Sequence, residues 1–391
     1  MRLFGMSRLL VGALSAGLIT VAVPMEAGAS VSVKQQWALS GSGAGVLFGF
    51  DTALQSKTLV VGDANHGVAG AVFVYMKINS SWVKEATLTG KDSAGGDGFG
   101  NAVALEGRTL VVGAQGHNGA HGAVYVFTGS GKSWTQTQEL TVTPAGTYGQ
   151  FGWSVAISGS TIVAGAPNVS GAAFVFTKSG LGKWTLRKQL TASDETNGDG
   201  FGYTLALNGS TLFAGSPFHG ATAGSVYVFT GSGGSWKQRT EFRGRDTVAS
   251  DNFGIGELAA SGTDVLVGAP LHAAGAGASY VFTGSGSKWK QQAELKGKDT
   301  VAGDHFGFGE AIDGSTIVVG ADRHAPGGMA YVFTRSGTAW KQQAEFKGKD
   351  TAAGDVFGRW VSLSVAGSVA TVAVGAPEHA TNIGRVYIFR A

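Results

Sequence analysis

The sequence predicts an all-β fold, a seven-bladed β-propeller with four antiparallel strands in each blade. Three observations favour this fold. A Phe-Gly pair recurs seven times, the copies lie 50–53 residues apart, and glycine-rich turns divide each interval into four short strand-like runs. The blades are expected to begin near Phe48, Phe99, Phe151, Phe201, Phe253, Phe306 and Phe357.

The unit that starts at Phe201 shows the four strands most clearly. Glycines end the first two runs, and residues 231–234 form a glycine-rich hairpin turn in which positive φ is permitted. A Trp begins the fourth run, which alternates in polarity, as it does in five other units. We interpret these Trp side chains as cover for the outer core. The four expected strands span residues 202–209, 210–215, 225–230 and 236–242.

The two ends of the chain favour a closed ring over an open β-solenoid. The last unit stops at residues 386–389 and lacks its fourth strand. Residues 33–39 resemble an isolated fourth strand, because they begin with the Lys-Gln-Gln that also stands at 290–292 and 341–343. We therefore expect strand 33–39 to complete the last blade, which would remove the free sheet edges between the first and last units.

The N-terminus predicts a secreted or cell-surface protein. Residues 1–29 have the pattern of a signal peptide, with Arg2 and Arg8 before an apolar run and Ala-Gly-Ala at 27–29 as the cleavage site. The alternative is an N-terminal membrane anchor, but the apolar run over 9–23 is short for a span of about 20 residues. Residues 30–391 would form a single propeller domain without a membrane span, expected to be a monomer.

Composition excludes several classes of function. The chain has 65 glycines and no cysteine, so disulfides, thiolate metal sites and cysteine catalysis are ruled out. Its formal charge is only +3, and the basic residues form no block, so nucleic-acid binding is not expected. An extracellular protein or a glycan is the expected partner.

Two polar features repeat with the blades. A His stands four residues after the glycine that ends the second strand in every unit except the third, which has Val169. These histidines are His66, His117, His219, His272, His324 and His379. A pair of Asp five residues apart precedes Phe-Gly in five units, as Asp92/Asp97, Asp194/Asp199, Asp246/Asp251, Asp299/Asp304 and Asp350/Asp355.

Connectivity places both features on one face, because the loops after the second and fourth strands of an antiparallel blade lie at the same end. Neighbouring blades are about 10 Å apart, so one metal ion shared around the ring is excluded by ligand bonds of about 2 Å. Three interpretations of the His/Asp face stay open: loop pins, repeated ligand sites in the grooves between blades, or a metal held by one His–Asp group.

One further feature breaks the repeat. Three residues after Phe-Gly, the fifth and sixth units carry Glu257 and Glu310, whereas the other units have Thr52, Val103, Val155, Leu205 and Val361. Two neighbouring carboxylates on innermost strands can act as a general acid and base. The alternative is that both reach a solvated central channel.

The motifs resemble the FG-GAP repeat family, which is named for Phe-Gly and Gly-Ala-Pro. The second element stands at 165–167, 268–270 and 375–377. The resemblance implies a seven-bladed propeller like that of integrin α subunits, with roles in adhesion and ligand binding; some related fungal propellers are lectins. Integrin-type calcium loops of the form Asp-x-Asp-x-Asp-Gly are missing at 105–107, 157–159, 207–209 and 312–314, so no calcium and no other cofactor is expected.

The leading prediction is therefore a secreted or cell-surface binding or adhesion module without enzymatic activity, which uses the His/Asp face. The alternative is a carbohydrate-binding lectin with repeated sites between blades. A third hypothesis is a hydrolase or lyase with Glu257 and Glu310 as its carboxylate pair. A single specific site is expected where the repeats differ, around the third blade or at these two Glu.

Overall fold

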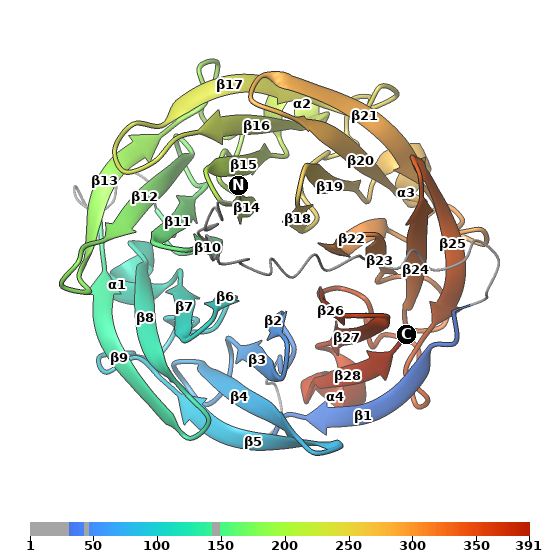
Figure 1. The fold of residues 1–391 in the computed structure, drawn as a ribbon, viewed down its shortest axis with the longest axis horizontal. Coiled ribbons are helices and arrows are strands. Elements are labelled where there is room, and N and C mark those ends of the chain that lie inside the picture. Colours follow the sequence, from blue (N-terminus) through green and yellow to red (C-terminus); the bar gives the residue numbers. More distant parts are fainter. Residues whose placement is uncertain (1–30, 43–46, 143–148) are drawn as a thin grey trace, which may run out of the picture.

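A computed structural model describes residues 31–42, 47–142 and 149–391. The predicted signal peptide lies outside the described residues. The structure confirms the predicted fold: seven antiparallel four-stranded sheets stand around a central axis as the blades of a propeller (Figure 1). The first strand of each blade lies nearest the axis and the fourth lies at the rim.

The blades follow the chain in order, each with its strands in sequence from the axis outward. Blades 1 to 3 comprise β2 (Asp51–Gln55), β3 (Thr58–Asp63), β4 (Ala71–Ile78) and β5 (Ser81–Leu88); β6 (Ala102–Glu106), β7 (Thr109–Ala114), β8 (Ala123–Ser130) and β9 (Ser133–Leu140); and β10 (Val155–Ser158), β11 (Thr161–Ala166), β12 (Ala172–Lys178) and β13 (Trp184–Leu190). Blades 4 to 6 comprise β14 (Leu205–Asn208), β15 (Thr211–Ser216), β16 (Ser225–Thr230) and β17 (Lys237–Phe242); β18 (Leu258–Ser261), β19 (Asp264–Ala269), β20 (Ala278–Ser285) and β21 (Lys288–Leu295); and β22 (Phe306–Asp313), β23 (Thr316–Ala321), β24 (Met329–Ser336) and β25 (Ala339–Phe346).

Blade 7 confirms the predicted closure. It takes β26 (Val361–Ala366), β27 (Val369–Ala376) and β28 (Arg385–Arg390) from the C-terminal end and β1 (Lys34–Ser40) from the N-terminal end. β1 runs antiparallel to β28, from Lys34 opposite Arg390 to Ser40 opposite Arg385. The first and last parts of the described chain are thus joined by strand hydrogen bonds.

The two glycine motifs meet at every blade interface. The seven Phe of the Phe-Gly pairs are fully buried, and Phe99, for example, packs among Val60 and Val72 of blade 1 and Leu110 of blade 2. The glycine of each Phe-Gly pair has positive φ. Its carbonyl oxygen lies against a second glycine, the one near the end of the second strand in the preceding blade, where a Cβ would collide with it. At Gly320 that Cβ would lie 1.8 Å from the oxygen of Gly358. Only residues without a side chain allow the blades to approach so closely.

The apolar core is divided into seven clusters, each shared by strands of neighbouring blades. The Trp at the start of each fourth strand belongs to or packs against one of them, and Trp82, Trp184 and Trp236 are at most 5% exposed. These rings therefore cover the outer core, as the sequence predicts. Within the described residues, no helix is long and apolar enough to span a membrane.

The turns between first and second strands are linked in a circle. A side chain near the end of each first strand hydrogen-bonds the backbone of the corresponding turn in the next blade. Gln55 accepts from the Gly107 N–H at 2.6 Å, and Ser364 of blade 7 accepts from the Ser56 N–H of blade 1 at 3.0 Å. In blade 4 the direction is reversed, because the Asn208 amide donates to the Gly262 carbonyl oxygen. In the remaining pairs the side chain accepts from the backbone N–H: Glu106–Gly159, Ser158–Gly209, Ser261–Gly314 and Asp313–Val365.

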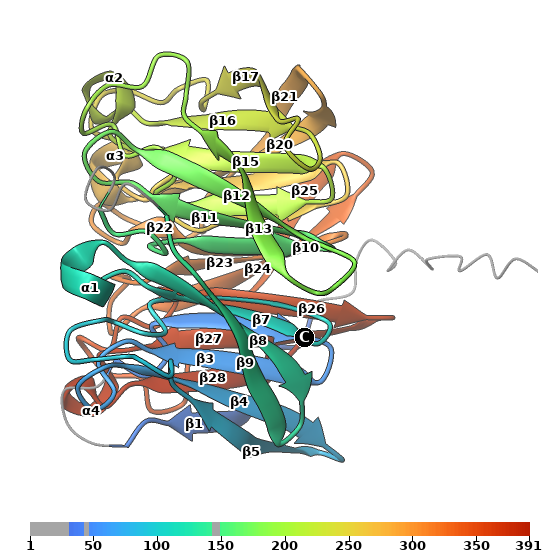
Figure 2. The ribbon, with the colours of Figure 1, turned by 90° about the vertical axis from the view of Figure 1, so that its left-hand side faces the viewer.

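The opposite face carries the loops after the second and fourth strands (Figure 2). Four of the loops after the second strand contain one short helical turn that begins at a predicted His: α1 (His117–Ala120), α2 (His219–Thr222), α3 (His272–Gly275) and α4 (His379–Asn382). Residues inside these turns have left-handed dihedrals, such as φ 52° and ψ 55° at Ala273. Left-handed backbone is disfavoured for residues with a Cβ, so other contacts must hold these loops in place.

Candidate functional site

The repeated His and the second Asp of each pair form a direct hydrogen bond in five blades. His117 Nδ1 lies 2.8 Å from Asp97 Oδ2, and His379 Nδ1 lies 2.6 Å from Asp355 Oδ2. The same bond joins His219 to Asp199, His272 to Asp251 and His324 to Asp304. Because the Asp belongs to the linker between blades and the His to the left-handed turn, the bond fixes one loop on the other.

The second Asp also holds its own loop. In each of the five linkers its Oδ2 accepts the backbone N–H of the residue three positions earlier, as from Ala94 to Asp97 at 2.8 Å. Asp97 is 4% exposed and His117 is 5% exposed. The His–Asp contact that the loop-pin interpretation predicts is present, and the Nδ1 and Oδ2 atoms are engaged within the protein.

The first Asp of each pair is held by a buried Tyr of the third strand. The Tyr125 hydroxyl donates to Asp92 Oδ1 at 2.9 Å, and the same bond recurs for Tyr227, Tyr280, Tyr331 and Tyr387. Burial, followed by the hydrogen bond to the carboxylate, raises the pKa of each of these Tyr far above its usual range. These hydroxyls therefore stay protonated, and the second oxygen of each first Asp turns toward the His ring.

His66 and Val169 mark the two blades that depart from this pattern. The linkers before Phe48 and Phe151 lack the Asp pair. His66 therefore faces Asp63 of its own blade, 3.3 Å from Nδ1 to Oδ2, and Asp63 Oδ1 accepts the Leu47 N–H at 3.1 Å. The structure thus brings five of the six predicted His together with a linker Asp and leaves His66 in a different contact.

Glu257 and Glu310 do not occupy the same place in their blades. Glu310 on β22 pairs with Val319, whereas Leu258, not Glu257, stands opposite the matching Val267 in blade 5. Blade 5 has one extra residue between Phe-Gly and its first strand, so equal spacing from Phe-Gly does not mean equal position. Glu257 and Glu310 therefore share their spacing from Phe-Gly but not their place in the blade, although the Glu310 N–H donates to Glu257 Oε2 at 3.0 Å.

Glu257 is instead the counterpart of Asp51 in blade 1. Each carboxylate accepts backbone N–H groups of neighbouring inner strands: Asp51 that of Val103 at 2.7 Å, and Glu257 those of Glu310 and Val361 at 3.0 and 3.1 Å. Burial raises the pKa of Asp51 to about 7 and, with the charge of Asp51 adding to it, that of Glu257 well above its usual range. These groups tie inner strands together around the axis.

Glu310 faces the interface between blades 5 and 6. It is 2% exposed, and neither carboxyl oxygen has a partner within hydrogen-bond distance among the described residues, although the nearby Ser279 hydroxyl acts to lower its pKa. A Cβ added to Gly268 of β19 would lie 3.1 Å from its Oε1, which places the carboxyl group against blade 5. Burial, with the charge of Glu257 adding to it, raises the pKa of Glu310 well above its usual range and so favours its neutral form.

The residues directly after Phe-Gly were missed by the sequence analysis. Several are aromatic and half-buried. Phe50 packs at a tilt against Trp360, which lies one residue further on in blade 7, with ring centroids 4.5 Å apart, and Trp153 packs on Tyr203 at 5.0 Å. Arg359 lies 4.2 Å over the ring of Phe308. The signal was available, because the position follows a motif that the sequence analysis had already aligned.

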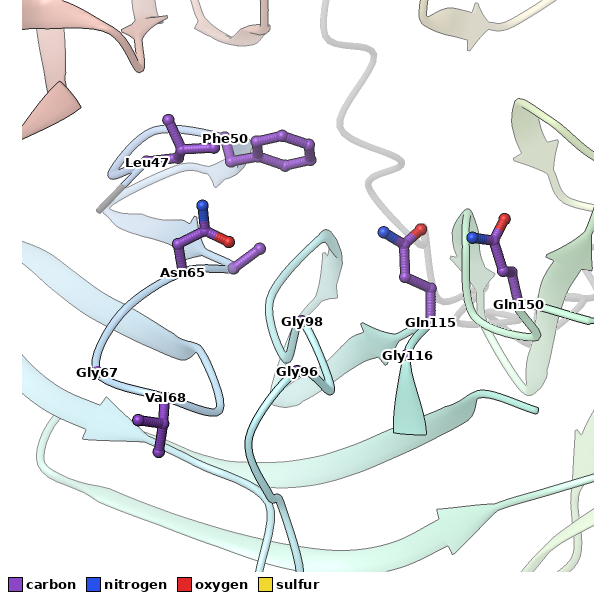
Figure 3. Close-up of a pocket in the computed structure, with 11 residues that line it drawn as sticks. Leu47, Phe50, Asn65, Gly67, Val68, Gly96, Gly98, Gln115, Gly116 and Gln150 are labelled. Carbon is purple, nitrogen blue, oxygen red and sulfur yellow. The ribbon is translucent and has the colours of Figure 1, made fainter. Parts of the chain in front are cut away.

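A pocket of about 560 Å³ opens over blades 1 to 3, on the face that carries the His/Asp networks. All of its lining comes from loops after second and fourth strands, with Phe50, Asn65, Gln115 and Gln150 as its larger polar and aromatic groups (Figure 3). No Asp, Glu, Lys, Arg or His is among the described residues that line it. Two of the linkers here, before Phe48 and Phe151, are those without an Asp pair.

Comparison with protein families gives one result. Segments 82–127, 134–176, 184–229, 289–333 and 340–389 match the model of the FG-GAP repeat. The chain belongs to the FG-GAP repeat family. Each matched segment of this FG-GAP propeller runs from a fourth strand to the third strand of the next blade, so the family unit contains both glycine motifs, which meet those of the neighbouring units at successive interfaces.

The unit over residues 236–282, which has the extra residue between Phe-Gly and its first strand, is not among the matched segments. No curated protein matches the chain significantly.

Proposed function

We propose that this propeller is a secreted or cell-surface binding module without enzymatic activity, and that its ligand binds in the pocket over blades 1 to 3. The observation that carries the proposal is the pocket itself: a concave site with a few convergent polar groups is what small-ligand and chain-end recognition requires. The signal-peptide pattern of residues 1–29 supports an exported protein.

The chemistry of the lining favours an uncharged polar ligand. Asn65, Gln115 and Gln150 offer amide groups that both donate and accept hydrogen bonds, and Phe50 offers an apolar ring. Hydroxyl groups and peptide amides match such a surface, whereas a charged ligand would find no counter-ion in it. In the His/Asp networks the His Nδ1 and the second Asp are engaged in hydrogen bonds within the protein, which favours the pocket as the site for an uncharged polar ligand.

A carbohydrate ligand is the second candidate, because amides beside an aromatic ring suit the hydroxyls and apolar face of a sugar. This candidate differs from the lectin predicted from the sequence, since it uses the pocket over blades 1 to 3 and not repeated sites between all blades. We do not propose hydrolase or lyase activity. Glu310 is buried and Glu257 is bound to two backbone N–H groups, so neither carboxylate is placed to reach a substrate.

The test uses a glycan array and a display library of extracellular proteins and peptides, probed with the purified protein. The double variant Asn65→Ala/Gln115→Ala should weaken binding of any hit by about 5- to 100-fold, as expected for the loss of one or two hydrogen bonds. Gln36→Ala, an exposed amide on the outermost strand of blade 7, is the matched control and should leave binding unchanged.

Two outcomes count against the proposal. Equal loss of binding in Gln36→Ala and in the double variant would place the ligand elsewhere. Hits that survive the double variant at full affinity would exclude the pocket, and an array without glycan hits would reject the carbohydrate candidate.

A further inference from the structure

Three of the five His/Asp networks carry a third side chain that the sequence analysis did not consider. A Glu of the fourth strand stands opposite the network Tyr, as Glu139 does opposite Tyr125, and joins the His and the first Asp. In these groups one ligand atom from each residue lies within 4.8 Å of the others. We call them the Asp–His–Glu clusters; they are Asp92/His117/Glu139, Asp194/His219/Glu241 and Asp246/His272/Glu294.

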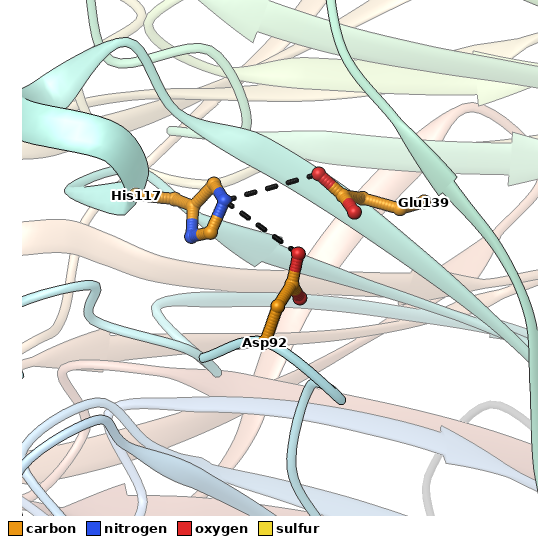
Figure 4. Close-up of side chains that lie close together, drawn as sticks. All are labelled: Asp92, His117 and Glu139. Carbon is orange, nitrogen blue, oxygen red and sulfur yellow. Dashed lines mark ion pairs between the residues drawn. The ribbon is translucent and has the colours of Figure 1, made fainter. Parts of the chain in front are cut away.

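The histidine of the first cluster has one nitrogen free. Nδ1 of His117 is fixed by Asp97, and Nε2 points between two carboxylates, 3.9 Å from Asp92 Oδ2 and 3.8 Å from Glu139 Oε1 (Figure 4). Both distances are too long for a hydrogen bond, and Nε2 has no such bond among the described residues. A side chain that is 5% exposed thus aims an unpartnered nitrogen at two oxygens.

The surroundings of the cluster resemble the outer shell of a metal site. A carboxylate on the far nitrogen of a ligating His fixes its ring and tautomer, and a hydrogen bond to a ligating carboxylate fixes the oxygen that remains. Asp97 does the first for His117, and the Tyr125 hydroxyl does the second for Asp92. The same two supports are present in the clusters of His219 and His272.

The spacing suits a small divalent ion. Ligands bound to zinc at 2.0–2.2 Å in a tetrahedron lie about 3.4 Å from one another. The His Nε2 to Asp Oδ2 distances are 3.9, 3.7 and 3.5 Å in the three clusters, and all ligand atoms of a cluster lie within 4.8 Å of one another, so side-chain shifts of up to about 1.4 Å bring them to tetrahedral spacing. Asp92 and Glu139 are partly exposed and free to make that adjustment.

We propose that each Asp–His–Glu cluster binds one divalent transition-metal ion, zinc fitting best, through His Nε2 and one oxygen of each carboxylate. One imidazole with two carboxylates suits zinc and its neighbours, whereas calcium requires six to eight oxygen ligands. Three protein ligands leave the fourth tetrahedral position to water or to a group of a bound partner. This proposal departs from the sequence-based expectation of no cofactor and does not depend on the pocket.

The other two networks provide internal controls. In blade 7, Ala38 of β1 stands opposite Tyr387 where the clusters have Glu, and Arg385 pairs with Asp350. In blade 6, Glu345 accepts a hydrogen bond from Gln342 at 3.3 Å, and it is not part of a cluster among the described residues. Three bound ions, not five, are therefore expected.

The three sites should differ in affinity. In the third cluster the ammonium of Lys296 pairs with Glu294 at 2.6 Å, so an ion must displace it. His117 is the most buried of the three His, and no Lys or Arg pairs with Glu139 among the described residues. The site of His117 should bind most tightly and the site of His272 most weakly.

The experiment measures metal stoichiometry on untagged mature protein that has been stripped with a chelator. Titration with zinc chloride by calorimetry, with metal content after gel filtration, should give three equivalents per chain. Cobalt(II) should give the intense visible absorption of a tetrahedral site. Zinc should also raise the melting temperature, because it binds only the folded state.

Isosteric variants assign the sites. Glu139→Gln, Glu241→Gln and Glu294→Gln should each remove one equivalent, and the triple variant should bind none and lose the cobalt absorption. Glu345→Gln is the matched control and should retain three. Circular dichroism verifies that each variant is folded. Wild-type protein without zinc binding, a triple variant that still binds three ions, or loss of an ion in Glu345→Gln would each overturn the proposal.

Discussion

Replacement of Glu310 by Val should stabilise the protein. Glu310 is 2% exposed, and its carboxyl oxygens have no hydrogen-bond partner among the described residues. Leaving a buried polar group unpartnered costs about 1–3 kcal/mol. Val occupies the matching place in blades 2, 3 and 7, so the substitution restores the apolar contact that the repeat itself uses. We expect the free energy of unfolding of Glu310→Val at pH 5 to exceed the wild-type value by about 1–3 kcal/mol.

The gain should grow with pH. The pKa of Glu310 is raised in the folded protein, so the folded state keeps a proton that the unfolded chain releases above about pH 4.3. Wild-type stability from this group is complete below that pH and is lost as the pH rises toward the folded pKa, by up to about 1.4 kcal/mol per unit. The variant has no such loss.

Urea unfolding at pH 5, 6, 7 and 8 measures the difference between variant and wild type. Glu310→Gln separates the two effects, because it removes the titration but keeps a polar group: its gap to Glu310→Val should stay constant with pH. A Val variant that is less stable than wild type at pH 8, or a difference that does not change with pH, would refute the reasoning.

Two further predictions concern the blade interfaces. Gly320→Ala should lower the free energy of unfolding by about 2–3 kcal/mol or more, because its Cβ would lie 1.8 Å from the Gly358 oxygen; Gly180→Ala, whose Cβ meets nothing within 4 Å, should change it by less than about 0.5 kcal/mol in the same urea titration. Deletion of residues 31–40 removes β1 with buried Leu39 and should cost about 3–5 kcal/mol, read as a lower melting temperature. An unchanged melting temperature would contradict closure by β1.

The fold could be predicted from the sequence because each blade interface requires the same residue types at the same positions of the repeat. Phe-Gly and the glycine near the end of the second strand are constrained by the same close approach, so both must recur at each interface. The pairing of β1 with β28 could be predicted because an incomplete last unit and an orphan Lys-Gln-Gln strand complement each other. Neither inference required knowledge of side-chain geometry.

The site could be predicted only in part. The face and the contact of the linker Asp with the His follow from connectivity, which the sequence reveals. The extra residue before β18 was hidden, because counting from Phe-Gly cannot detect a one-residue shift between motif and strand. The Glu of the Asp–His–Glu clusters was overlooked although Glu139, Glu241, Glu294 and Glu345 each follow the network Tyr by fourteen residues. The pocket could not be predicted, because it depends on how loops of three blades lie together.

The closure of blade 7 also means that β1 must remain without its hydrogen-bonding partner during synthesis of the propeller. β1 is synthesised about 350 residues before its partner β28. At about 5–20 residues per second, β1 waits on the order of 20–70 s without its neighbour. During that time its single deeply buried side chain, Leu39, and the exposed polar residues that alternate along it limit its tendency to pair with other chains. The strand that completes the ring is therefore suited to remain unpaired until the rest of the propeller has formed.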